Sequence, residues 1–314
     1  MVPVTRDELL SALAGLRRAN IGGRRAPHKP LLLLWLLGRL AAHGSSQVAY
    51  HDSEEPVSRL INEYGPPRKG SARDRAAMPF VHLERELWDL TDVDGGPIDP
   101  GLRESGPLLR QLGAVGRLRP EAEQLLSDPG TMAVAVRLLL EQHFTSSLEE
   151  AICEQAGLDL RGLEVSLLEA ALSGALAGTR AYRPRPRTRR SGFAEEVLAA
   201  YGHACSMCGY DGALRGYPAG LEAAHVRWHS QDGPDEVSNA LALCALHHRL
   251  FDLGALGLTE DRTIRVSGRY ASTGPAGAAV TALDGVRLSL PRRREAAVAT
   301  PHITWHDRQV FKYA

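Results

Sequence analysis

Two pairs of metal-ligating residues stand at matching spacing in the second half of the chain. Two residues separate Cys205 from Cys208, and Cys244 and His247 repeat that spacing. A Cys-x-x-Cys turn brings two thiolates to one tetrahedral ion, and a Cys-x-x-His pair at a helix start supplies two further ligands. Four protein ligands leave no open position, so the pattern predicts a structural Zn²⁺ whose binding free energy contributes to folding. The alternative is a surface loop that carries these cysteines by chance.

A second set of polar residues is interleaved with the first: His225, Asn239, His248 and Asp252. The apolar segment that ends at His225 predicts the first strand of a hairpin, and His248 falls on the helix predicted after Cys244. Neighbouring helical side chains point about 100° apart, so a zinc-facing His247 leaves His248 facing the hairpin. Asp252 follows four residues later on the same face, which predicts a two-ligand site for a hard divalent cation, Mg²⁺ or Mn²⁺.

The order of these motifs resembles that of the HNH endonucleases, also called His-Me finger or ββα-metal nucleases, over roughly residues 192–314. The resemblance implies that His225 is the general base that activates water. It implies that Asn239 fixes the loop between the hairpin and the helix and keeps His225 in orientation. His248 would then hold the metal that stabilises charge on the scissile phosphate and the leaving 3′ oxygen.

The chain departs from the family's pattern at the residue before the base. Many members carry a metal ligand there, and this chain has Ala224. The full ligand set therefore stays open: Asp252 takes a position that other HNH sequences often fill with His, and Glu222 is a weaker candidate.

The first half of the chain carries helical signals. Thr5-Arg-Asp-Glu8 is a capping box, and Pro30 stands at the start of a leucine-rich helix that runs to about Ala42. Ser146-Ser-Leu-Glu149 predicts a second capping box. Extended pieces are expected over residues 79–90, 263–266 and 286–290.

A basic loop before the leucine-rich helix, Arg24-Arg-Ala-Pro-His28-Lys29-Pro, and the later Met78-Pro79-Phe80 carry a second resemblance. They resemble the sulfur-binding domain of phosphorothioate-dependent (type IV) restriction endonucleases, over roughly residues 1–155. These enzymes pair that domain with a C-terminal HNH domain. The resemblance implies double-stranded DNA bearing phosphorothioate as the partner.

Sulfur recognition has a simple physical basis. A phosphorothioate sulfur is larger, softer and a poorer hydrogen-bond acceptor than the oxygen it replaces. An apolar pocket accommodates it but leaves a phosphate oxygen without donors, a penalty of about 1–3 kcal/mol. Pro79, flanked by Met78 and Phe80, is the candidate wall, and Tyr64 is a weaker choice. The candidate polar contacts around the pocket are Arg24, His28, Lys29 and Arg103. The alternative makes Pro79 an ordinary strand-start proline, with Met78 and Phe80 in the core.

The whole chain, at 314 residues, is long enough for two domains with separate cores. We predict an α+β protein with a mostly helical DNA-reading domain over residues 1–155 and a ββα-metal HNH domain over residues 191–314. A helical segment and an Arg/Pro-rich linker fill residues 156–190. The 37 basic and 37 acidic side chains cancel, so local basic clusters rather than net charge would bind DNA. Each cluster could equally be a solvated face.

Cysteine usage and hydropathy bear on the compartment. Three of the four cysteines belong to the zinc pattern, and Cys153 falls in a helical run as a small apolar residue. This usage suits a reducing cytoplasm better than a disulfide scaffold. The apolar run from Leu31 to Leu37 is too short to span a bilayer, so no membrane association is expected.

Together these patterns predict a modification-dependent restriction endonuclease that binds phosphorothioated DNA and hydrolyses nearby phosphodiester bonds. One HNH site cuts one strand, so duplex cleavage implies two copies, expected as a homodimer. One alternative is an HNH endonuclease directed at methylated DNA, although the 5% aromatic content disfavours the cage a flipped base needs. The other is a non-catalytic zinc-containing DNA-binding regulator, which would have no need for His225, Asn239 and His248 together.

Overall fold

The computed structural model divides into two compact units. One comprises Met1–Ile21 with Arg25–Pro184, and the other Gly22–Arg24 with Arg185–Ala314. The structure describes residues 5–17, 20–21, 24–67, 73–172 and 192–313. The predicted Arg/Pro-rich linker at residues 183–190 lies outside the described residues.

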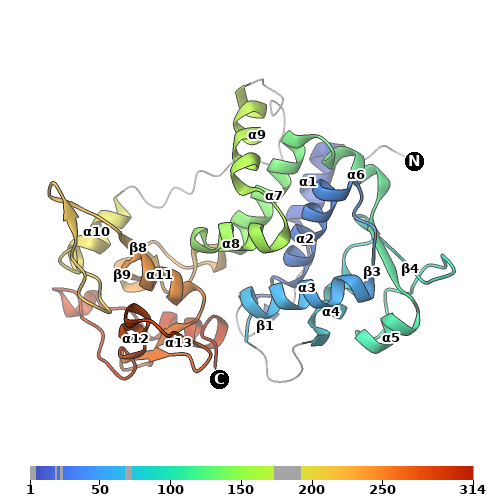
Figure 1. The fold of residues 1–314 in the computed structure, drawn as a ribbon. Helices are drawn as coiled ribbons and strands as arrows, with labels where there is room; N and C mark the ends of the chain where they lie inside the picture. Colours follow the sequence, from blue (N-terminus) through green and yellow to red (C-terminus); the bar gives the residue numbers. More distant parts are fainter. Residues whose placement is uncertain (1–4, 18–19, 22–23, 68–72, 173–191, 314) are drawn as a thin grey trace. The chain divides into compact units, whose positions relative to one another are not determined.

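The first unit is mostly helical (Figure 1). Its helices are α1 (Arg6–Ala14), α2 (His28–His43), α3 (Tyr50–Tyr64), α4 (Ala77–His82), α5 (Gly106–Gln111), α6 (Pro120–Leu126), α7 (Pro129–His143), α8 (Ser146–Ala156) and α9 (Leu160–Leu172), with the 3-10 turn η1 (Arg73–Ala76). A small antiparallel sheet has the strand order β3 (Val48–Ala49), β5 (Val115–Leu118), β4 (Trp88–Thr91). The short strands β1 (Asn20–Ile21) and β2 (Arg24–Arg25) pair separately.

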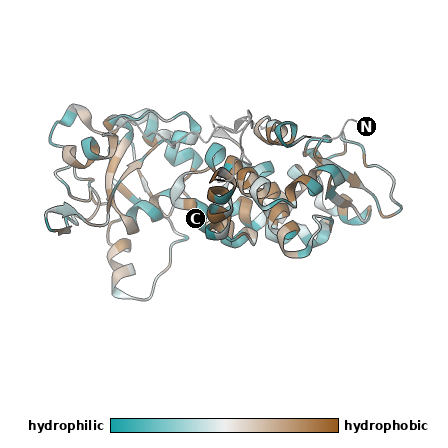
Figure 2. Ribbon diagram, turned by 90° about the horizontal axis from the view of Figure 1, so that it is seen from above, coloured by the Kyte–Doolittle hydropathy of each residue, from teal (hydrophilic) through white to brown (hydrophobic). Residues whose placement is uncertain are grey.

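Helix α2 forms the centre of the first unit. Its leucines from Leu31 to Leu34 are fully buried, because α3, α7 and α8 pack around it. The packing against α8 requires a glycine, since a Cβ on Gly38 would lie 1.8 Å from the carbonyl oxygen of Ala156. Figure 2 shows the hydropathy of the residues along these helices. Most of α2 is buried because most of its sequence is apolar, while Trp35 and Arg39 are half-buried and its last three residues are exposed.

Local signals in the first unit are only partly confirmed. The Thr5–Glu8 capping box is present at the start of α1. The second predicted capping box is wrong: Ser146 is already helical and Thr145 is the N-cap, without a side-chain hydrogen bond. Glu149 instead accepts a 2.7 Å hydrogen bond from Arg137 Nη1. Glu149 on α8 therefore pairs with Arg137 on α7 instead of capping the start of its own helix.

The extended structure expected over residues 79–90 is also largely wrong. Residues 77–82 form α4, and strand β4 begins only at Trp88. Pro79 is the third residue of α4, where a missing N–H leaves no helical hydrogen bond unmade. Phe80 faces the core instead of alternating, with its ring 5.1 Å from Tyr50 and 5.3 Å from Trp88.

The second unit contains a hairpin followed at once by a helix (Figure 1). Strands β8 (Leu221–His225) and β9 (Ala240–Cys244) pair antiparallel, and α11 (Ala245–Asp252) starts at the next residue. The other elements are α10 (Phe193–Ala200), β6 (Ala213–Leu214), β7 (Tyr217–Pro218), η2 (His229–Gln231), η3 (Val237–Asn239), β10 (Leu256–Leu258), β11 (Ile264–Val266), α12 (Pro275–Thr281), η4 (Arg294–Ala296) and α13 (Thr300–Gln309). This ββα order confirms the predicted α+β class.

The remaining strand predictions in the second unit have mixed outcomes. β11 is formed and pairs with β10. The strand expected over residues 286–290 is wrong: only an isolated bridge joins Thr263 to Arg287. The backbone of this segment still contacts β11, because the Ile264 N–H donates a hydrogen bond to the Val286 carbonyl. The pairing does not continue as a β-ladder. In the described part of the chain, every helix is too short or too polar to cross a bilayer.

Candidate functional site

The four predicted zinc ligands come together in the second unit. Cys205 and Cys208 lie in the turn after α10, Cys244 is the N-cap of α11, and His247 lies in its first turn. Their ligand atoms all fall within 4.8 Å of one another. The Sγ atoms of Cys205 and Cys244 lie 3.5 and 3.3 Å from His247 Nδ1. Three sulfurs and one imidazole nitrogen at this spacing could hold one metal ion.

The electrostatics of the cluster favour a thiolate at Cys205. Burial alone would raise the pKa of this thiol. Hydrogen bonds from His247 and from the backbone N–H groups of Cys208 and Cys244 outweigh burial and lower the pKa. A thiolate is the form that binds a metal ion.

His225 lies at the end of β8 and is nearly buried. Its Nε2 atom is 2.8 Å from Asp235 Oδ1. Its ring stacks on Phe193, with 4.8 Å between centroids and 24° between planes. The ring of His229 is the next aromatic neighbour, at 6.1 Å. One nitrogen of the ring is thus held by a carboxylate and one face by an aromatic ring.

Asn239 is fully buried and fixes the loop between the two strands of the hairpin. Its Oδ1 accepts the backbone N–H of Arg227 at 2.9 Å, and its Nδ2 donates to the carbonyls of Arg227 and Pro234 at 3.0 Å. The loop passes so close that a Cβ on Gly233 would lie 1.8 Å from the Arg227 carbonyl oxygen. The loop that Asn239 holds lies between the two strands and not between the hairpin and the helix as expected, because α11 begins directly after Cys244.

His248 lies on α11 between two carboxylates. Its Nδ1 is 2.5 Å from Glu222 Oε2, and its Nε2 is 3.1 Å from Asp252 Oδ2. The other oxygen of Asp252 accepts the indole N–H of Trp228 at 3.0 Å. Burial would lower the pKa of His248, but the charges and hydrogen bonds of Asp252 and Glu222 raise it to about 9. Without a metal, the site therefore holds a proton at neutral pH.

Strand register explains why Glu222 reaches His248. Side chains alternate along β8, so Glu222 and Ala224 share one face and His225 belongs to the other. Ala224 has no ligand atom, and Glu222, two residues earlier on the same face, supplies a carboxylate that contacts His248.

Sequence analysis did not anticipate Asp235 or Trp228. Asp235 directly follows Gly233-Pro234, and this Gly-Pro pair, typical of a turn, is the sequence feature that could have drawn attention to it. Trp228 had no signal, because its partner Asp252 lies 24 residues away in sequence. His225 and His248 contact different carboxylates.

Three of the residues predicted to contact DNA lie in the interior of the first unit. Lys29 Nζ forms a buried ion pair with Glu84 Oε1 at 2.6 Å. His28 Nε2 lies 3.1 Å from Nη2 of the buried Arg75. Phe80 is fully buried between aromatic rings. The first turn of α2 packs into the unit, so its polar residues are paired inside it.

The other predicted contacts of the first unit differ in accessibility. Arg103 is exposed. Met78 is half-buried and Pro79 is buried on α4. Tyr64 is buried beside Pro66, whose carbonyl accepts a 2.9 Å hydrogen bond from Arg75. The side chain of Arg24 lies outside the described residues.

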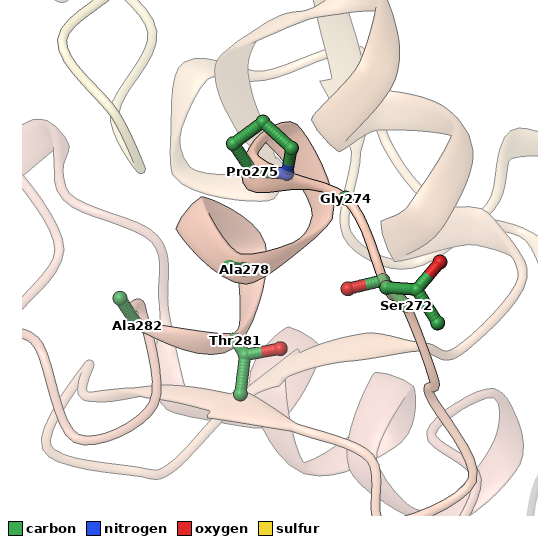
Figure 3. A pocket seen from close by; sticks show the side chains of 7 residues that line it. Ser272, Gly274, Pro275, Ala278, Thr281 and Ala282 are labelled. Carbon is green, nitrogen blue, oxygen red and sulfur yellow. The ribbon is translucent and has the colours of Figure 1, made fainter.

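A surface pocket around α12 is unrelated to these groups (Figure 3). Its lining consists of Ser272, Thr273, Gly274, Pro275, Ala278, Thr281 and Ala282. None of these side chains titrates near neutral pH or is a usual metal ligand, so the pocket is not the candidate site.

Comparisons with known families identify both parts of the chain. Residues 6–161 match the ScoMcrA-like DNA sulfur-binding domain, and residues 205–259 match the HNH endonuclease family. The second match covers the Cys3His cluster together with His225, Asn239 and His248. No curated protein matches the chain.

Solved structures provide more distant similarities. A modification-dependent TagI restriction endonuclease is 25% identical, with 39% of this chain and 38% of that chain covered and a TM-score of 0.29. The sulfur-binding domain of SprMcrA complexed with phosphorothioated DNA is 22% identical, with coverages of 50% and 96% and a TM-score of 0.42. The type IV phosphorothioation-dependent restriction endonuclease ScoMcrA is 14% identical, with coverages of 77% and 93% and a TM-score of 0.38. This chain thus spans well under half of the TagI chain.

The Asn239 geometry generates a prediction about stability. Asn239→Ala leaves the N–H of Arg227 and the carbonyls of Arg227 and Pro234 without their partner. We expect a loss of about 2–4 kcal/mol in the free energy of unfolding of the second unit, measured by urea denaturation. Ser238→Ala is the control, because its hydroxyl bonds only the exposed Glu236 and should change stability by less than about 0.5 kcal/mol. Equal stabilities for the two variants would contradict the role of Asn239.

Proposed function

We propose that this chain, which joins a ScoMcrA-like DNA sulfur-binding domain to an HNH endonuclease domain, binds phosphorothioated DNA and hydrolyses phosphodiester bonds near the modification. The recognition domain would span residues 1–155 and the nuclease domain residues 191–314. The observation that carries the proposal is the presence of both family matches on one chain. The arrangement of His225, Asn239 and His248 supports hydrolysis by the second domain.

In the proposed reaction, His225 takes a proton from the attacking water. The new P–O bond forms as the bond to the leaving 3′ oxygen breaks, and that oxygen takes a proton from solvent. Phe193 covers one face of the imidazole, which restricts the ring to the orientation set by its hydrogen bond. A bound Mg²⁺ or Mn²⁺ would stabilise the charge on the scissile phosphate and the leaving oxygen.

The ligands of this cation are proposed to be His248 Nδ1 and the Glu222 carboxylate. Glu222 is about half exposed, with 49% of its side chain accessible, so it can face a phosphate and a cation together. Asp252 has 1% of its side chain accessible, and both its oxygens are engaged by Trp228 and His248. Metal-binding histidines commonly donate their other ring N–H to a carboxylate. Asp252 therefore orients His248 instead of binding the cation, which revises the ligand pair expected from the sequence.

The metal of the Cys3His cluster is proposed to be Zn²⁺. Thiolates and imidazole are the ligands that Zn²⁺ prefers, and four of them close its tetrahedral shell. The cluster joins the turn at Cys205 and Cys208 to the start of α11, so the ion would hold His248 in place from the opposite side of the helix.

The substrate and assembly follow from the same proposal. The sulfur-binding domain would select the modified backbone, with exposed Arg103 available for a phosphate contact. An HNH site hydrolyses one strand, so breakage of a duplex needs two copies of the chain. A homodimer on DNA meets that requirement.

The zinc proposal predicts one tightly bound zinc per chain. Elemental analysis of the purified protein should find zinc near unit stoichiometry. Cys208→Ser should lose the ion and lower the thermal midpoint of the second unit, because metal binding is coupled to folding. Cys153→Ala is the control, since Cys153 is buried in α8 and should leave the zinc content unchanged. A zinc-free, fully folded Cys208→Ser protein would contradict a structural role for the ion.

The ligand assignment predicts that removing Glu222 weakens metal binding, whereas removing Asp252 lowers stability. Glu222→Ala should weaken Mn²⁺ binding by about 10-fold or more, followed by electron paramagnetic resonance of free Mn²⁺. Asp252→Ala should lower metal-free stability by about 1–3 kcal/mol, because Trp228 loses a buried acceptor. Glu260→Ala, which removes an exposed carboxylate bonded to Thr304, is the control for Mn²⁺ binding. Unchanged Mn²⁺ affinity in Glu222→Ala would exclude Glu222 as a ligand.

The proposed activity is tested with one plasmid prepared with and without phosphorothioate. We expect cleavage of the sulfur-bearing plasmid alone, with Mg²⁺ or Mn²⁺ and not with chelator. His225→Ala should bind that plasmid and fail to cut it, with a rate loss of about 10²–10⁴-fold. Equal cleavage of both plasmids would reject sulfur recognition and keep the nuclease. Binding without cleavage under all metal conditions would instead favour a DNA-binding regulator.

A further inference from the structure

We infer that Asp235 is a positioning residue for the general base His225, an inference that rests on the proposed function. The His–Asn–His pattern does not include Asp235. Its Oδ1 lies 2.8 Å from His225 Nε2, within hydrogen-bonding distance. The accessible fractions of the two side chains are only 8% for His225 and 14% for Asp235. A short contact between two largely buried polar groups is poorly screened by water, so it constrains the imidazole strongly.

The contact decides which ring nitrogen is the base. An ionised carboxylate only accepts hydrogen bonds, so Asp235 favours the tautomer with the proton on Nε2. The lone pair then lies on Nδ1, at the other side of the ring. Stacking on Phe193 limits rotation of the ring, and so keeps this assignment fixed. Asp235 thus selects Nδ1 as the atom that accepts the proton of the attacking water.

The structure also shows how Asp235 is held. The carbonyl of the preceding residue, Pro234, accepts a 3.0 Å hydrogen bond from Asn239 Nδ2. Asn239 also bonds both backbone groups of Arg227, at the start of the same loop. Gly233 permits the approach, because any Cβ there would overlap the Arg227 carbonyl. Asn239 therefore acts on the base through Asp235, by fixing the loop that carries the carboxylate.

The charge of Asp235 also matters during proton transfer. When His225 accepts a proton it becomes an imidazolium, and the adjacent carboxylate stabilises that cation. The ring of His229 lies 6.1 Å from the His225 ring between centroids, and Phe193 on the stacked face is uncharged. Loss of the Asp235 charge should make His225 a weaker base with a lower protonation midpoint.

The first test needs no DNA and therefore does not depend on the proposed function. Histidine ring signals of the full chain are titrated by NMR, with His225→Ala used to assign the His225 resonance. Asp235→Asn keeps the shape and an acceptor but removes the charge, and should lower the protonation midpoint of His225. Asp232→Asn is the matched control: Asp232 is exposed in the same loop and its left-handed backbone, at φ 62°, suits Asn. It should leave the midpoint unchanged.

The second test measures cleavage of phosphorothioated plasmid across pH. Asp235→Asn should cut about 10- to 100-fold more slowly at its plateau, with the acidic limb of the profile at lower pH and DNA binding unchanged. Asp235→Ala should be slower still, and Asp235→Glu should recover part of the rate.

The inference is overturned if Asp235→Asn has the wild-type titration of His225, or cuts at the wild-type rate with the same pH profile. A wild-type chain that cuts neither plasmid rejects the proposed function, and the NMR titration then still decides whether Asp235 governs the protonation of His225.

Discussion

The arrangement of the second unit depends on the register of β8 and β9. Leu221 lies opposite Cys244, and His225 lies opposite Ala240. Because α11 begins directly after Cys244, this pairing places one residue of the Cys3His cluster, the helix and the strand that ends at His225 in one rigid frame. A slip of one residue would move every side chain of β8 to the other face. Glu222 would then lose His248, and His225 would lose Asp235.

Helix geometry allows adjacent histidines to take part in different sites. His247 and His248 follow one another on α11, and their directions differ by about 100°. His247 therefore joins the cysteine sulfurs, while His248 joins Glu222 and Asp252. A metal in the Cys3His cluster would fix the start of the helix, and the buried bond from Trp228 to Asp252 fixes its end. The position of His248 is thus determined at both ends of a helix only eight residues long.

Contacts close in sequence were the part that the sequence could predict. Local spacing predicts the two pairs of ligands, each with two residues between its members, the hairpin, and the i to i+4 relation of His248 and Asp252. The sequence did not predict which residues pair with the buried charged side chains. Lys29 looked available for DNA, because its partner Glu84 is 55 residues away and nothing in the basic loop indicates it. Phe80 looked like a pocket wall because its neighbours Tyr50 and Trp88 come from separate elements.

Recognition of a modified phosphate and hydrolysis of the DNA backbone require different groups, which explains why the chain has two domains. Hydrolysis by one base and one cation, as proposed for His225 and His248, would act on the backbone that every DNA sequence shares, so these groups would carry no information about the target. Selectivity must therefore be supplied elsewhere, and the sulfur-binding domain is the part of the chain with a basis for it. A sulfur differs from oxygen mainly in size and hydrogen bonding, so discrimination of about 1–3 kcal/mol per modified phosphate is modest. Two copies of the chain, each bound through its own first domain, would raise the selectivity of a double-strand break because both strands must then be recognised.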